Sequence, residues 1–216
     1  MGKSYGAAEM RVLRRFGRSQ MLLVAVAVVA VGAALFVVLS PPGRSVANGA
    51  SGGSLTGTTT ETRWGPLGPL DRDLLTKVRL AGLWEMPAGQ MAQERSGSAR
   101  VKEVGQMIAE QHAQLDADTR TTARRLGVML PSQPNSDQQG WLREMSGATG
   151  ADFDRTFVLR LRAAHGKVFP VIAQVRSESR NTEVRAFAER ALRYVNTHMT
   201  LLESTGLATQ ESLVSK

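Results

Sequence analysis

Cysteine is absent from the 216-residue sequence. Its absence excludes disulfide bonds, thiolate zinc sites and thiol nucleophiles. Histidine is scarce, with three in the whole chain, and aromatic residues account for only 5%. None of the three histidines belongs to a His-Glu-x-x-His metalloprotease motif. The sequence therefore does not predict a particular enzymatic activity.

Concentrated positive charge is confined to the first 20 residues. This stretch carries five basic side chains and one acidic side chain, about half of the net charge of +8. From residue 69 onward, 20 basic and 17 acidic side chains are interspersed. Nucleic-acid binding requires a concentrated basic face, so we expect no nucleic-acid partner.

One long apolar run, MLLVAVAVVAVGAALFVVL, extends from Met21 to Leu39. As a helix it would be about 28 Å long, close to the ~30 Å hydrocarbon core of a bilayer. Basic residues precede the run and only Arg44 follows closely, which predicts a cytoplasmic N-terminus. We expect a basic cytoplasmic tail over residues 1–20, a single transmembrane helix in lipid over 21–40, and a domain outside the bacterial plasma membrane. The alternative is a signal peptide, cleaved near residues 45–47, and a secreted domain.

Residues 41–69 are rich in Gly, Ser, Thr and Pro. Such a segment buries too little apolar surface to offset the entropy lost on ordering it. The composition therefore predicts a flexible linker over residues 41–69. A folded domain over 70–207 and a short C-terminal tail over 208–216 complete the expected organisation.

After the linker, apolar residues recur at the three- and four-residue spacing of amphipathic helices, without strand-like alternation. The first two predicted helices span about residues 71–94 and 98–127. The third begins near Asp152, and the fourth begins at Asn181 or Thr182, residues that cap helices well. Pro87 predicts a kink or a division of the first helix, and Pro170 predicts a bend in the third.

The lengths of the connections predict how these helices pair. The first connection and the last are short, so each joins an antiparallel hairpin. The connection between the second and third helices is much longer, and QQGWLREM within it is expected to form a short helix. Two hairpins joined by a crossover predict an all-α, four-helix bundle.

Each of the three histidines falls on the apolar stripe of its own helix, and Glu85 lies on the stripe of the first helix. If the helices align, four metal-capable side chains meet in the core. Imidazole and carboxylate groups together suit copper, zinc, nickel or iron. We therefore predict a transition-metal site, with copper, zinc and iron as candidates. Its predicted ligands are Glu85, His112, His165 and His198.

Two other interpretations follow from the same residues. In the first, each histidine is an ordinary buried polar group, and the domain is a structural or interaction module that docks a protein partner at the cell envelope. In the second, the bundle oxidises iron at a di-iron centre, which requires Glu-x-x-His motifs. These motifs are absent, because Ala109, Arg162 and Val195 stand three residues before the histidines.

The order and spacing of several segments resemble the bacterial ferritin-like family called domain of unknown function 4142. These segments are AGLWEMPAGQMA, SARVKEVGQMIAEQHAQL, LGVMLP, MSGATGADFDRTFVLRLRAAH and EVRAFAERALRYVNTHMTLL, which together cover about residues 74–202. The resemblance implies a ferritin-like four-helix bundle in an exported or membrane-attached protein, without an established activity. Such proteins usually carry Asp before the histidines of the second and third helices, where this chain has Gln111 and Ala164.

Overall fold

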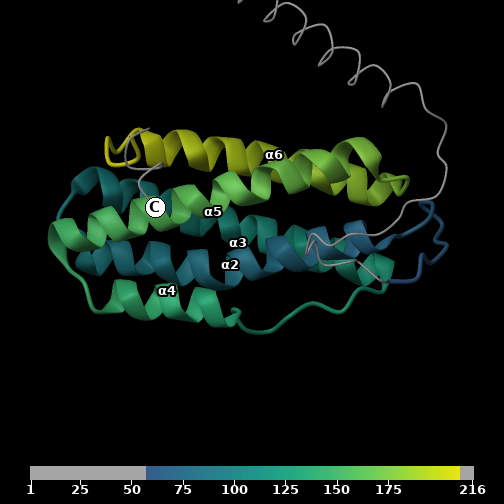
Figure 1. Ribbon diagram of the computed structural model, residues 1–216, viewed down its shortest axis with the longest axis horizontal. Coiled ribbons are helices and arrows are strands. Elements are labelled where there is room, and N and C mark those ends of the chain that lie inside the picture. Colours follow the sequence, from purple (N-terminus) through teal and green to yellow (C-terminus); the bar gives the residue numbers. More distant parts are fainter. Residues whose placement is uncertain (1–56, 210–216) are drawn as a thin grey trace, which may run out of the picture. The chain divides into compact units, whose positions relative to one another are not determined.

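The computed structural model describes residues 57–209. Within these residues the fold is all-α and contains five helices: α2 (Pro69–Arg95), α3 (Ala99–Leu126), α4 (Ser136–Ser146), α5 (Gly150–Glu178) and α6 (Thr182–Glu203) (Figure 1). The four long helices and the short helix between the second and third are thus confirmed. None of the five is long and apolar enough to cross a membrane. The predicted basic tail, the predicted transmembrane helix, residues 41–56 and residues 210–216 lie outside the described part of the chain.

Local sequence explains most helix ends. At the start of α3, Ser98 Oγ accepts a hydrogen bond from the Val101 amide, as an N-cap serine does. The helix ends at Gly127, whose φ of 64° is in the left-handed region that glycine adopts without a Cβ clash. At the start of α6, Asn181 Oδ1 accepts from the Val184 amide.

Both internal prolines lie within continuous helices. Pro87 is inside α2 and Pro170 is inside α5. Of the two outcomes predicted at Pro87, a kink or a division, the division is therefore excluded. Proline removes one intrahelical hydrogen bond, but Glu85 and Ala88, on either side of it, are both buried against the rest of the bundle. Tertiary packing thus holds the helix together through the proline.

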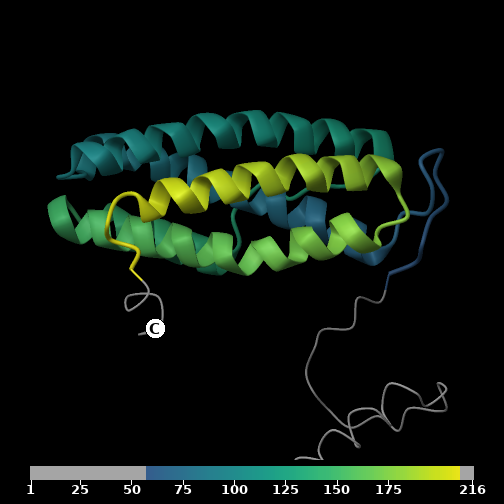
Figure 2. The ribbon, with the colours of Figure 1, turned by 90° about the horizontal axis from the view of Figure 1, so that it is seen from above.

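The four long helices form a bundle of two hairpins. Residues 96–98 join α2 to α3 and residues 179–181 join α5 to α6, while α2 also packs on α5 and α3 on α6. Figure 2 shows α6 lying between α3 and α5. Ser96 and Gly150 form a bridge, so α5 starts beside the hairpin at which α3 starts. The chain must therefore return along the bundle between α3 and α5, and α4 does so against α2 and α5 (Figure 1).

Residues 57–68 pack on the bundle, although their composition suggested a flexible linker as far as residue 69. Thr60 and Leu67 pair across a turn, and Leu67 is fully buried in the core. The Asn181 side-chain amide donates to Thr62 Oγ1 and to the Gly65 carbonyl, at 3.1 and 3.0 Å. The buried leucine and these hydrogen bonds offset the entropy of ordering the segment. The folded domain therefore begins earlier than the sequence suggested.

Two glycines allow α2 and α3 to approach closely. A Cβ atom at Gly89 would lie 2.4 Å from the Gly105 carbonyl oxygen, and one at Gly105 would lie 2.6 Å from the Ala92 Cβ. Only glycine avoids both clashes. The close approach lies one turn beyond Glu85 on α2, and it holds this carboxylate near the facing side of α3.

Candidate metal centre

A layer of polar side chains divides the bundle core into two apolar clusters. On α3, Ile108 belongs to one cluster and Leu115 to the other, with His112 between them. The same order holds on α5 and α6, where the flanking pairs are Leu161 with Ile172, and Leu202 with Val195. We call Glu85, His112, His165 and His198 the polar layer. Each of its members comes from a different long helix.

The structure brings together all four residues that the sequence singled out. Their exposed fractions are 3% or less, and one nitrogen or oxygen atom from each lies within 4.8 Å of those of the others. Glu85 Oε2 is 2.9 Å from His112 Nε2 and 3.5 Å from His165 Nε2. His165 Nε2 is in turn 2.9 Å from His198 Nδ1.

Hydrogen bonds on the outer side of two imidazoles determine where their protons lie. His165 Nδ1 is 2.8 Å from the Leu161 carbonyl oxygen, which can only accept, so this nitrogen carries the proton and donates it. His198 Nε2 likewise donates to Gln111 Oε1 at 3.0 Å. The inner nitrogens, His165 Nε2 and His198 Nδ1, are therefore both left with lone pairs, and they face each other at 2.9 Å. A cation placed between them would turn this repulsion into attraction, and outer hydrogen bonds of this kind are typical of metal-bound histidines.

His112 differs from the other two histidines. Its Nε2 faces the Glu85 carboxylate, whereas its Nδ1 is fully buried and has no hydrogen-bond partner among residues 57–209. An unpartnered buried polar atom costs about 1–3 kcal/mol. Such atoms are rare in native proteins and require a structural or functional reason. Besides the two facing lone pairs, the polar layer therefore contains a third imidazole nitrogen, His112 Nδ1, whose hydrogen-bonding capacity is not satisfied.

The charge state of the layer follows from its burial. Burial alone would raise the pKa of the Glu85 carboxyl, but the neighbouring His165 and His112 outweigh it and lower this pKa below its ordinary value of 4.5. Burial lowers the pKa of His165. Burial, together with His112 and His165, lowers the pKa of His198 to about 2. At neutral pH the layer thus presents an ionised carboxylate and at least two neutral imidazoles, the forms that bind metals.

We expect acid to destabilise the metal-free protein. The pKa of His198 is ordinarily 6.5 but about 2 in the folded state. Between these values the unfolded chain binds a proton that the native chain does not, so the free energy of unfolding falls as pH falls, by at most ~1.4 kcal/mol per pH unit. The lowered pKa values of His165 and Glu85 act in the same direction, below pH 6.5 and 4.5 respectively.

Urea unfolding at about pH 7 and about pH 5 measures this effect. In the wild-type protein the free energy of unfolding should be clearly smaller at the lower pH. His198→Leu removes one of the responsible groups, so the variant should lose less stability between the two pH values. An equal loss in both proteins would contradict the assignment to His198.

The atoms of the layer come close to the geometry of a mononuclear site. Four ligands in a tetrahedron with bonds of ~2.0–2.1 Å lie about 3.3–3.4 Å apart. The separations of 2.9 and 3.5 Å bracket that value, whereas the widest, 4.8 Å, must shorten. The layer contains one carboxylate, whereas di-iron bundles need several. The side chains present therefore suit one transition-metal ion with three nitrogen ligands and one oxygen ligand.

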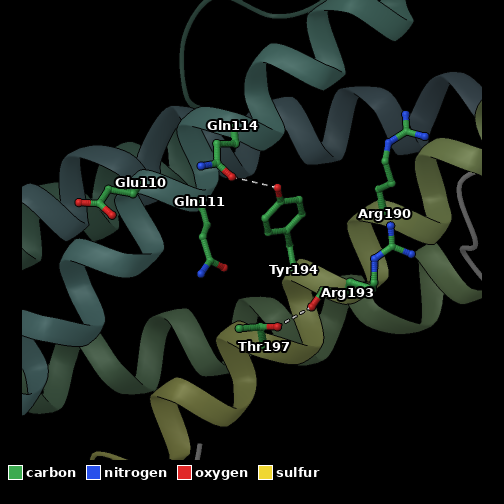
Figure 3. Close-up of a pocket in the computed structure, with 7 residues that line it drawn as sticks. All are labelled: Glu110, Gln111, Gln114, Arg190, Arg193, Tyr194 and Thr197. Atoms are coloured by element: carbon green, nitrogen blue, oxygen red, sulfur yellow. Dashed lines mark hydrogen bonds between the residues drawn. The ribbon is translucent and has the colours of Figure 1, made fainter.

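Sequence reasoning did not find the role of Gln111. This side chain was notable only because the related family usually has Asp there, yet it orients His198 from the neighbouring helix. Figure 3 shows Gln111 of α3 and Tyr194 of α6 at a surface hollow of about 480 Å³ between the two helices. The Tyr194 hydroxyl donates to Gln114 Oε1 at 3.2 Å, and its ring centroid lies 6.3 Å from that of His198. Helix periodicity places position 111 beside the apolar stripe and not on it. The residue of α6 that Gln111 contacts depends on how α3 and α6 pack, so the sequence alone does not identify it.

One protein-family model covers both the helical bundle and the polar layer. A family model described as "Domain of unknown function (DUF4142)" matches residues 57–204. The chain belongs to this family. The DUF4142 match begins with the turn that packs against Asn181, runs through α6 and contains the complete polar layer. No curated protein and no solved structure matches the chain significantly.

Proposed function

We propose that the DUF4142 domain of this protein binds one transition-metal ion in the polar layer, through Glu85 and the three histidines. The main support is the pair of inward lone pairs on His165 and His198, which face each other at 2.9 Å beside an ionised carboxylate. Hydrogen bonding to Leu161 and Gln111 leaves neither inner nitrogen a proton. A cation between these nitrogens and beside the carboxylate satisfies all three groups at once.

The ligand set restricts the ion and its chemistry. Three imidazoles and one carboxylate without thiolate suit Zn²⁺, Cu²⁺ or Fe²⁺, while Mg²⁺ and Ca²⁺ prefer all-oxygen sites. Four protein ligands complete a tetrahedral shell, as in structural zinc sites, whereas catalytic zinc sites keep one position open. The proposed activity is therefore metal binding rather than metal-assisted hydrolysis.

The proposed setting is the outer face of the bacterial plasma membrane. The length and apolar character of residues 21–40 and the basic residues before them support a retained anchor with a cytoplasmic N-terminus. We also assign the bundle to the ferritin-like class. Two antiparallel hairpins joined by one crossover along the bundle support this assignment.

Metal uptake by the full-length chain tests the proposed function. Metal-free protein is dialysed against Zn²⁺, Cu²⁺ or, without oxygen, Fe²⁺, and bound metal is measured by elemental mass spectrometry. We expect a single ion per chain for at least one of these metals. His198→Ala should lose it, whereas the control Thr197→Ala, at the exposed neighbouring position, should retain it. No uptake, or uptake that His198→Ala leaves unchanged, would reject the metal site and favour an envelope interaction module.

A further inference from the structure

A second hollow, of about 290 Å³, lies between α2, α4 and α5, and Glu85 is among the residues that line it. The helix pair α3 and α6, with the hollow that Gln111 lines, is on the opposite side of the polar layer. The lining includes the indoles of Trp84 and Trp141, which meet edge to face with centroids 5.0 Å apart. Gln138 and Lys167 contribute polar groups to the lining, and Val168 contributes an apolar side chain.

Several nearly buried side chains of this hollow have polar atoms without protein partners. Glu85 is 2% exposed and directs Oε2 toward the imidazoles, while its Oε1 makes no hydrogen bond within residues 57–209. Trp84 is 1% exposed, and its indole N–H likewise has no partner in this part of the chain. Gln138 is 7% exposed and uses its amide oxygen to cap α4, which leaves its NH₂ group unbonded among the same residues.

These atoms are not sealed in the interior. In the described part of the chain, the fully buried side-chain atoms without a partner are Asp71 Oδ1 and His112 Nδ1. Glu85 Oε1, the Trp84 indole N–H and the Gln138 NH₂ group are therefore reachable, and the hollow is the space that all three residues line. Buried polar groups are normally satisfied. Three groups without a protein partner around one hollow can therefore all bind to the same ligand.

The charges of the hollow define what the ligand must carry. Lys77 at the rim is neutralised by Asp73 at 2.6 Å, whereas exposed Lys167 has no ion pair within residues 57–209. The lining thus offers one cation at an exposed position, N–H donors and aromatic rings, and one carboxylate oxygen of a nearly buried side chain. A matching molecule is anionic at its outer end and donates a hydrogen bond at its inner end. The small volume, near the lower limit of about 300 Å³ for ligand pockets, restricts it to roughly one ring.

We propose that the hollow between α2, α4 and α5 binds a small hydroxylated organic anion, with the anionic group at Lys167 and the hydroxyl group donating to Glu85 Oε1. The indole N–H of Trp84 and the NH₂ group of Gln138 bind further acceptor atoms of the ligand. This site goes beyond the metal site and does not require an ion, because it uses the carboxylate oxygen that makes no contact with the imidazoles.

Tryptophan indole signals of the full-length, metal-free protein in a ¹⁵N–¹H correlation spectrum provide the test, with 4-hydroxybenzoate as the probe. The chain has three tryptophans, so Trp64, which is not in the hollow, serves as an internal control. Trp84→Phe and Trp141→Phe assign the signals. We expect the Trp84 and Trp141 signals to shift and saturate with a dissociation constant on the order of 1 mM, as for a ligand with few contacts, while Trp64 stays unchanged.

Matched variants and analogues separate the individual contacts. Lys167→Met should weaken binding by about fivefold, the effect of one exposed ionic contact, whereas Lys102→Met, a lysine outside the hollow, should have no effect. Neutral 4-hydroxybenzamide and benzoate, which lacks the hydroxyl group, should both bind more weakly. The proposal is overturned if neither indole signal shifts, if all three shift alike, or if the neutral analogue binds as well as the anion. Because the titration uses no metal and metal uptake is measured without the probe, the failure of either proposal leaves the other standing.

Discussion

Zinc is expected to raise the midpoint of thermal unfolding of the metal-free protein by roughly 10 °C. At a free concentration of ~1,000 times the dissociation constant, a ligand that binds only the native state stabilises it by about 4 kcal/mol. In a domain of this size, each kcal/mol moves the midpoint by about 2–4 °C. Only the native state would hold the ion tightly, since the four candidate ligands come from four helices and separate on unfolding. Thermal unfolding followed by circular dichroism, with and without Zn²⁺, measures the shift.

A single substitution in the layer should remove this stabilisation. His165→Ala deletes one of the two lone pairs that the outer hydrogen bonds direct inward. Its midpoint should stay almost constant when zinc is added. The matched control is Arg155→Ala, at an exposed position of the same helix, and it should keep the full shift. An undiminished shift in His165→Ala would place any bound zinc outside the polar layer.

The second large effect is expected at Arg79, where substitution by alanine should lower the free energy of unfolding by about 3 kcal/mol or more. Arg79 of α2 and Asp116 of α3 form an ion pair whose side chains are 8% and 10% exposed. Arg79 Nε also donates to the Pro131 carbonyl oxygen at 3.1 Å, which ties the crossover to the bundle. Removal of the guanidinium leaves a nearly buried carboxylate without its main partner and a carbonyl group without its donor.

Arg120→Ala is the matched control for that prediction, because Arg120 binds the same carboxylate at 2.8 Å from a position 57% exposed. Exposed ion pairs contribute about 1 kcal/mol or less, so this variant should be nearly as stable as the wild type. Replacement of both buried partners, as in Arg79→Met with Asp116→Leu, should recover much of the lost stability. Urea unfolding quantifies all three variants. Equal losses in Arg79→Ala and Arg120→Ala would show that the buried pair has no special weight.

Much of the fold could be predicted because its information is local. The three- and four-residue spacing defines the helices, and residues such as Ser98, Gly127 and Asn181 define their ends through capping. The long crossover also follows from connection length. The helix is undivided at Pro87 and residues 57–68 are ordered for a common reason: local propensity disfavours helix or order there, and burial against distant parts of the chain outweighs it.

The candidate site was only partly predictable. Periodicity predicts the angle of each side chain around its helix axis, and it places Glu85 and each histidine on the buried face. Their height along the bundle depends on the register of the hairpins, and contacts such as Gly89 against Gly105 set that register between residues far apart in sequence. The roles of Gln111 and Arg79 were missed because each depends on a partner from another element.

The sequence by itself determined which side chains face the interior of this bundle and that they include all three histidines and one glutamate. It determined the helices, their order and the need for a crossover, since backbone hydrogen bonding and hydrophobic periodicity act over a few residues. Only the tertiary structure decided that these four groups meet at one level, which outer partners the imidazole nitrogens have, and that Glu85 also lines a hollow beside α4. Those properties depend on distances between helices, and such distances result from packing of the whole domain.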